Sequence, residues 1–272
     1  MMPEPAKLAI LGAGKMGETL ASALIEAKIL RPEQILVTAR HPQRAHEVAQ
    51  RFGVMAAMSN LEAAQQADII LLCVKPQVAR EVLAEINPVL RNEHLLISIL
   101  ASATTSFIEN LLSAKIPVVR AMPNTPSLLR VGMTVLCAGK QAERKHLEQA
   151  QRIFDAVGRT MIMDEKYMDA VTALSASGPA YIYVVLESLA EGGVKVGLPR
   201  HIATELAAQM CLGAAKMVLE TKAHPALLKD AVTTPAGCTI DGLLRLEEGG
   251  LRVTLIKAVV EATHRAKQLI DN

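Results

Sequence analysis

The stretch Ile10-Leu11-Gly12-Ala13-Gly14-Lys15-Met16-Gly17 decides the architecture of the chain. An apolar run at residues 7–11 stops at the first of three glycines, and apolar residues then recur at helical spacing as far as Ala27. This pattern predicts a strand, a tight turn and a helix. Gly-x-Gly-x-x-Gly at such a junction is the fingerprint of dinucleotide binding, because its glycines permit the turn, a close approach of pyrophosphate, and close packing of the helix. A plain tight turn is the alternative.

Short apolar runs and helical patterns alternate in the residues that follow. The runs occupy residues 35–38, 69–74, 95–100, 118–121, 133–137 and 160–163. Between two of them, Val78, Val82, Leu83 and Ile86 share one helical face. The alternation predicts βαβ units and a mostly parallel sheet. We therefore expect an α/β N-terminal Rossmann-type dinucleotide-binding domain over residues 1–163.

The pattern changes to long, Ala-rich helices at about Asp164. Residues 181–190 are apolar nearly all round, and Ile202, Leu206 and Met210 begin a second wide stripe. A helix that is apolar on nearly all faces must be buried. We therefore predict an all-α C-terminal dimerisation domain over residues 164–272, whose faces are covered by a second copy of the chain.

Composition excludes several classes of protein. Apolar residues make up 51% of the 272 positions and charged residues 21%, as in ordinary folded proteins. The net charge of +2 and the aromatic content of 2% argue against nucleic-acid binding. No apolar run approaches the roughly 18 residues of a membrane span. The first residues lack a signal-peptide pattern, which predicts a cytoplasmic location. The cysteines are scattered and predict neither a disulfide frame nor a metal site; they are Cys73, Cys137, Cys211 and Cys238.

The end of the second predicted strand indicates which dinucleotide binds. A site that prefers NAD usually places an acid there against the ribose 2′-hydroxyl, yet the chain reads Thr38-Ala39-Arg40, with no acid between Glu33 and Glu47. A guanidinium can instead hold a 2′-phosphate through paired hydrogen bonds. Arg40, with Arg44 as helper, therefore predicts NADPH, with NADH weaker. The alternative is that Arg40 is a solvated surface charge.

Two turns in the helical half carry small and hydroxyl-bearing residues. One is Ser175-Ala176-Ser177-Gly178-Pro179-Ala180-Tyr181, and the other is Thr233-Thr234-Pro235-Ala236-Gly237-Cys238-Thr239-Ile240. The second has the composition of an anion cradle at a helix N-terminus. A simple helix cap explains it equally well.

Together these motifs resemble the pyrroline-5-carboxylate reductases over nearly the whole chain. The resemblance also rests on Cys73-Val74-Lys75-Pro76-Gln77 and on Arg120-Ala121-Met122-Pro123-Asn124-Thr125-Pro126. It implies NADPH-dependent reduction of a cyclic imine, 1-pyrroline-5-carboxylate, to L-proline, the last step of proline biosynthesis. It also implies dimers of interlocked helical domains, which can assemble into rings of five dimers.

The resemblance implies positions for both ligands. Besides Gly17, Thr38 and Arg40, the cofactor residues are Leu11, Gly12, Ala13, Gly14, Lys15, Met16, Asn60, Cys73, Val74, Lys75, Pro76, Ile99, Leu100 and Ala101. The substrate residues are Thr234, Gly237, Cys238 and Thr239, near a dimer interface, with Glu165 as a further contact.

The residue types fit imine reduction. A protonated cyclic imine is already electrophilic, so hydride transfer needs positioning more than a strong base. We assign Thr239 as the catalytic hydroxyl on the ring nitrogen, and the backbone amides of residues 237–239 as the carboxylate site. Lys75, at the carboxyl end of a strand, steers cofactor phosphate or substrate carboxylate; a solvated lysine is the alternative.

Three positions depart from the family pattern, and two other functions compete. Ala176, Ala236 and Ser102 stand where glycine is common, and alanine tolerates positive φ poorly. A 3-hydroxyacid dehydrogenase would carry a lysine after the Ser177-Gly178 turn, whereas residues 180–185 contain none. A non-catalytic dinucleotide sensor would have no need of a substrate cradle.

Overall fold

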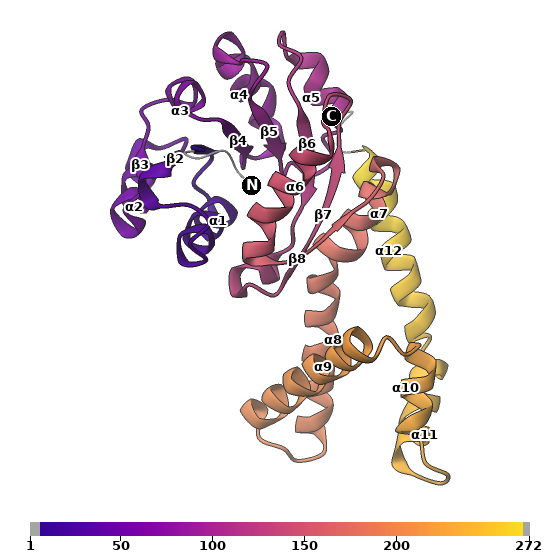
Figure 1. The fold of residues 1–272 in the computed structure, drawn as a ribbon. Helices are drawn as coiled ribbons and strands as arrows, with labels where there is room; N and C mark the ends of the chain where they lie inside the picture. Colours follow the sequence, from indigo (N-terminus) through magenta and orange to yellow (C-terminus); the bar gives the residue numbers. More distant parts are fainter. Residues whose placement is uncertain (1–5, 269–272) are drawn as a thin grey trace. The chain divides into compact units, whose positions relative to one another are not determined.

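The computed structural model describes residues 6–268 and divides the chain into two compact units. One holds the residues up to Ala176 together with those from Ala262 on, and the other extends from Ser177 to Glu261. In the first unit the described residues form one eight-stranded sheet of order β3-β2-β1-β4-β5-β6-β7-β8 (Figure 1). Its strands are β1 (Leu8–Leu11), β2 (Ile35–Thr38), β3 (Met55–Ala56), β4 (Ile69–Leu72), β5 (Leu95–Ser98), β6 (Val118–Met122), β7 (Gly132–Ala138) and β8 (Gly158–Ile162).

The sheet is doubly wound, as the alternating pattern predicts. Every pair of neighbouring strands is parallel except β6 with β7. From β1 the chain moves outward to β2 and β3, then returns past β1 to β4 and continues in the other direction. The carboxyl ends of β1 and β4 therefore flank the point where the strand order reverses, which is where open α/β sheets bind ligands.

Helices cover both faces of the sheet because side chains alternate along each strand. Leu8 and Ile10 pack with α1 (Lys15–Glu26), α2 (Pro42–Phe52) and α6 (Arg144–Phe154). Ala9 and Leu11 pack on the opposite face with α3 (Asn60–Gln66), α4 (Ala79–Ile86) and α5 (Thr105–Leu111). Both layers are visible in Figure 1. The predicted Rossmann-type domain is confirmed.

The second half of the chain is helical, as predicted. Its elements are α7 (Met168–Val171), a π-helical stretch (Thr172–Ala176), α8 (Gly178–Lys195), α9 (Arg200–Thr221), α10 (Pro225–Ala231), α11 (Cys238–Glu248) and α12 (Leu251–Gln268). Within the second unit α8 packs on α9 through small residues, and a Cβ added at Gly193 would lie 2.9 Å from the Ala203 Cβ. Ala190 and Ala207 are buried on the same two helices.

Large apolar side chains of these helices stay exposed in the single chain. Tyr183, Val184, Leu206 and Met210 are each about half exposed or more, whereas Ala190 is the one buried residue of α8. The predicted burial therefore does not occur within one chain. α9 is also, among the described residues, the one helix long and apolar enough to cross a membrane, with a mean hydropathy of 1.3. Length and composition alone are weak evidence of a span.

The compact units and the domain boundary predicted at residue 163 do not coincide. Residues 164–176 belong to the first unit, in part because Met168 is fully buried there beside Met122 and Cys137. Polar contacts of Glu165, described below, hold the same segment. The division into functional domains at 163/164 remains a prediction.

Candidate functional site

The glycine turn after β1 is built as its fingerprint requires. Gly12 has φ +108°, and an added Cβ would lie 2.7 Å from the carbonyl oxygen of Cys73, so no side chain fits there. The amides of Gly12 and Ala13 donate to the carbonyl oxygen of Thr38 at 3.1 and 2.6 Å. A Cβ on Gly17 would lie 2.5 Å from the carbonyl oxygen of Gly12. The turn thus ties β1 to β2 and β4.

Gly14 is different, because none of the described residues comes close enough to require glycine there. It precedes α1 with an ordinary φ of −80°, and no atom lies within 4 Å of an added Cβ. Lys15 and Met16 follow as the first residues of α1, whose N-terminal amides have no intrahelical partner. A glycine that packing does not need, at a helix N-terminus, fits the close approach of a phosphate group.

A cleft of about 370 Å³ opens beside this turn. It brings together five predicted cofactor residues: Gly12, Thr38, Arg40, Asn60 and Val74. Its remaining lining residues are Ala39, Pro42, Ala57, Met58, Ser59, Val78, Glu81, Val82 and Glu85. The cleft lies where β1, β2 and β4 end, so the structure unites predicted cofactor residues as far apart in the sequence as Gly12 and Val74.

The other predicted cofactor residues lie around the cleft rather than in its lining. Leu11 and Ala13 are buried. Cys73 follows β4, and exposed Lys75 and Pro76 come next, at the start of a 3-10 turn. The three residues after β5 are Ile99, Leu100 and Ala101; the Ile99 amide donates to the Leu72 carbonyl oxygen at 3.2 Å. All these positions lie at the carboxyl edge of the sheet.

Arg40 and Arg44 have different roles. The Arg40 guanidinium is exposed and makes no hydrogen bond or ion pair with the described part of the chain. Arg44 donates to Glu18, to Glu47 at 3.3 Å and to the carbonyl oxygen of Ala13 at 3.3 Å. These contacts use three of the five N–H groups of its guanidinium, and the prediction that Arg44 assists Arg40 stays a prediction.

Ser102 takes a left-handed conformation after β5, with φ +65°. It is buried, and its hydroxyl has no partner among the described residues. Left-handed backbone costs a side-chain-bearing residue about 1–2 kcal/mol, which exceeds the roughly 0.5–1 kcal/mol of extra backbone entropy that glycine loses. An unpaired buried hydroxyl adds about 1 kcal/mol or more.

Ser102→Gly is therefore expected to raise the free energy of unfolding by about 1 kcal/mol, because it removes both penalties. Urea unfolding at fixed protein concentration measures the change. Ser102→Ala is the matched control: it removes the hydroxyl, keeps the positive φ, and should recover part of the gain. Equal stability of all three proteins would contradict the assignment of strain to this residue.

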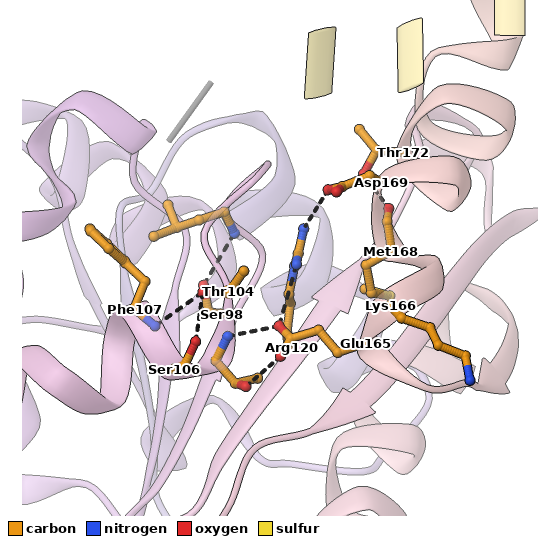
Figure 2. Close-up of polar contacts among 12 residues, drawn as sticks. Ser98, Thr104, Ser106, Phe107, Arg120, Glu165, Lys166, Met168, Asp169 and Thr172 are labelled. Atoms are coloured by element: carbon orange, nitrogen blue, oxygen red, sulfur yellow. Dashed lines mark hydrogen bonds and ion pairs between the residues drawn. The ribbon is translucent and has the colours of Figure 1, made fainter. Parts of the chain in front are cut away.

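Glu165 belongs to a polar cluster that sequence reasoning missed. One carboxylate oxygen accepts from the Thr105 amide at 2.7 Å and from Arg120 at 3.3 Å, and the other accepts from the Thr105 hydroxyl at 2.6 Å. Arg120 is 1% exposed and points between Glu165 and Asp169, the latter at 3.9 Å (Figure 2). These contacts make Glu165 a structural link between α5 and β6; its role as a substrate contact remains a prediction.

The predicted substrate residues form a turn and a helix start in the second unit. The Gly237 amide donates to the carbonyl oxygen of Thr234 at 3.1 Å, and Ala236 keeps φ +55° between them. The turn therefore has a left-handed residue at the position where the resemblance implies glycine. Cys238 and Thr239 begin α11. Ala176, by contrast, has no positive φ, so its departure from glycine causes no backbone strain.

This geometry corrects one assignment at the turn. Because the Gly237 amide is used within the turn, it is not free for a carboxylate. The amides of Cys238 and Thr239 make no hydrogen bond within the described chain, as expected at a helix N-terminus. The half-buried Thr239 side chain likewise has no hydrogen-bond partner there. Thr239 thus offers an amide and a hydroxyl at the same point.

The cysteines are free thiols, and the described residues contain no group of three His, Cys, Asp or Glu side chains able to hold a metal. Burial raises the pKa of the Cys137 thiol to about 12, and burial also raises the pKa of Cys73. Both thiols therefore stay protonated at neutral pH and pack as apolar groups. Cys238, at the start of α11, is exposed.

Comparisons with known proteins agree with both parts of this architecture. Residues 7–102 match a family described as NADP oxidoreductase, coenzyme F420-dependent, and residues 165–269 match one described as pyrroline-5-carboxylate reductase dimerisation. With the glycine turn and cleft, the first match defines the class as an NADP-dependent oxidoreductase. The second supports the predicted self-association through the helical half.

Full-length relatives then identify the family. A pyrroline-5-carboxylate reductase of Synechocystis is 43% identical over 97% of this chain and 98% of its own, and one of Glycine max is 39% identical over 99% of each. The solved reductase of Coxiella burnetii is 36% identical with a TM-score of 0.90, covering 97% of this chain and 98% of its own. That of Plasmodium falciparum, with NADP bound, is 33% identical with a TM-score of 0.88, covering 97% and 98%. The chain belongs to the pyrroline-5-carboxylate reductase family, which confirms the resemblance.

Proposed function

We propose that this chain reduces 1-pyrroline-5-carboxylate to L-proline with NADPH, the last step of proline biosynthesis. The observation that carries the proposal is the turn at residues 234–237 leading into α11, where the Thr239 hydroxyl and amide are uncommitted. The NADP-type cleft of the same chain and the reaction named for its full-length relatives support it. A sensor that only binds dinucleotide would need no such turn.

The main task of the protein in this reaction is to position the substrate and the cofactor for hydride transfer. When bound, the cofactor supplies a hydride to the carbon of the ring C=N bond while the nitrogen retains its proton, so that the imine becomes an amine and NADPH becomes NADP⁺. The Thr239 hydroxyl is assigned to the ring nitrogen, and the amides of Cys238 and Thr239 to the substrate carboxylate. Thr234 and Cys238 are proposed as further substrate residues of this turn, and the substrate role of Glu165 stays a prediction.

The direct test is oxidation of NADPH by the purified protein, followed by loss of nicotinamide absorbance with 1-pyrroline-5-carboxylate, and in parallel with NADH and a panel of 3-keto acids. Oxidation that depends on the imine is the expected result. Activity on a keto acid alone would favour a 3-hydroxyacid dehydrogenase, and tight NADPH binding without any turnover would favour a sensor.

Arg40 is proposed to hold the 2′-phosphate of NADPH, since it lines the cleft with a free guanidinium. Arg40→Ala is expected to raise the Kd for NADPH about 10- to 100-fold, the value of one or two charge-assisted hydrogen bonds, with little change for NADH. Titration of each cofactor against native and variant protein measures this. Arg40→Lys, which keeps the charge but loses the paired geometry, should fall between them. An unchanged NADPH-to-NADH ratio would place the phosphate elsewhere.

We further propose that the exposed apolar faces of the helical half are covered by a second copy of the chain, and that five such dimers assemble into a ring. The match of residues 165–269 to a dimerisation family supports the dimer. On this proposal the apolar surface of α9 meets protein rather than lipid, and the enzyme works in the cytoplasm without membrane or nucleic-acid partners.

A further inference from the structure

Glu85, on α4, accepts hydrogen bonds from the start of α3 beside the cleft. One carboxylate oxygen accepts from the backbone amides of Asn60 at 2.9 Å and Leu61 at 3.3 Å. The other accepts from the side-chain Nδ2 of Asn60 at 2.7 Å. Three donors therefore converge on a single carboxylate, and two of them belong to Asn60.

These three hydrogen bonds fix the orientation of the Asn60 side-chain amide. An ionised carboxylate only accepts hydrogen bonds, so the NH₂ group of Asn60 must face Glu85 and the Oδ1 atom must face away from it. Oδ1 lies 2.6 Å from the Thr38 hydroxyl oxygen. Because a carbonyl oxygen cannot donate, the Thr38 hydroxyl has to donate its hydrogen to Asn60. Glu85 thus sets the direction of two consecutive hydrogen bonds.

The direction matters because Thr38 and Asn60 line the cleft together with Arg40. With its hydrogen committed to Asn60, the Thr38 hydroxyl can offer a molecule in the cleft only its lone pairs. A ribose 2′-hydroxyl can donate to them, whereas a 2′-phosphate dianion has no hydrogen to give. At Thr38 the native hydrogen bonds therefore favour the ribose 2′-hydroxyl of NADH over the 2′-phosphate of NADPH. Arg40, by contrast, is proposed to favour the 2′-phosphate.

We propose that Glu85 is a positioning residue that limits the preference for NADPH over NADH by making Thr38 an acceptor. The proposal rests on the proposed use of this cleft for the adenosine end of the cofactor. It makes Glu85 a specificity determinant that acts through Asn60 rather than through contact with the ligand.

Glu85→Gln tests the proposal. The Gln Nε2 group needs an acceptor, so the Asn60 amide turns over, its NH₂ group faces Thr38, and the Thr38 hydroxyl becomes free to donate to a phosphate. The ratio of the NADH Kd to the NADPH Kd is expected to rise about tenfold, the effect of roughly 1.4 kcal/mol from one reversed contact. Thermal unfolding of the same proteins shows whether the variant is folded.

Glu81→Gln is the matched control, since Glu81 is on the same helix and lines the same cleft but makes no hydrogen bond with Asn60 in the described chain. It removes the same charge and should shift the ratio less than about twofold.

The outcomes separate this inference from the function on which it rests. If the unsubstituted protein fails to bind NADPH, the proposed function is wrong, independently of the result for the Glu85 variant. If it binds both cofactors and Glu85→Gln changes the ratio no more than Glu81→Gln, Glu85 does not act through hydrogen-bond direction. A clearly larger shift with Glu85→Gln than with Glu81→Gln supports the proposal.

Discussion

Thr239→Ala is expected to lower kcat for imine reduction by roughly 10- to 1,000-fold, the usual loss when one polar contact at a reacting centre is removed. Thr239 lies at the second position of α11, and its hydroxyl is not used inside the described chain. Other threonines of the helical half, such as Thr204, Thr221 and Thr233, instead donate to carbonyl oxygens four residues earlier. Among the described residues the Thr239 hydroxyl is free, and it lies beside the free amides at the start of α11.

The measurement is steady-state turnover with saturating NADPH, together with NADPH binding. Thr239→Ser is the matched control, because it keeps the hydroxyl and should retain most of kcat. Thr233→Ala removes a hydroxyl that bonds only to the Lys229 carbonyl oxygen and should leave kcat close to native. A Thr239→Ala protein with native turnover would remove the hydroxyl from the mechanism.

Leu206→Glu combined with Met210→Glu is expected to convert the protein to monomers and to abolish turnover. The two side chains are one helical turn apart on α9, and both are about half exposed in the single chain. A charge on each would have to be buried without a partner when a second copy covers the face, which costs several kcal/mol per ion. Two such penalties correspond to a loss of at least about a thousandfold in association.

Sedimentation velocity at micromolar concentration, with the turnover assay on the same samples, measures both effects. Leu206→Met with Met210→Leu exchanges the side chains at nearly constant volume and should leave the dimer intact. A double-Glu variant that still sediments as the native protein does would show that α9 is not the contact. Native protein that is monomeric but binds to lipid vesicles would instead indicate a membrane surface.

Local pattern was enough to predict most of the fold. The run at residues 35–38 coincides with β2, and the run at 118–121 covers β6 except for its last residue, Met122. The glycine turn was predictable because its requirements lie within a few residues of each other. β3 was missed because Met55 and Ala56 are too few to show a period.

Contacts between distant residues could not be predicted in this way. Glu85 meets Asn60 across 25 positions, and Glu165 meets Thr105 across 60. A single acidic residue on a helix carries no sign of its partner in the sequence. The same is true of Arg44, whose pairing with Glu18 is set by how α1 lies beside α2. Which charged side chains of the cleft are paired could therefore be determined only from the structure.

The Arg120 cluster has a consequence for synthesis on the ribosome. Arg120 lies in the interior of the sheet, yet the carboxylates that neutralise it belong to residues 165 and 169, beyond the last strand. A nascent chain that ends at residue 163 holds every strand but lacks both carboxylates that pair with Arg120. We therefore expect the nucleotide-binding part to reach its full stability only after the first turns of the helical half have emerged, so that the two halves depend on each other in time as well as in sequence.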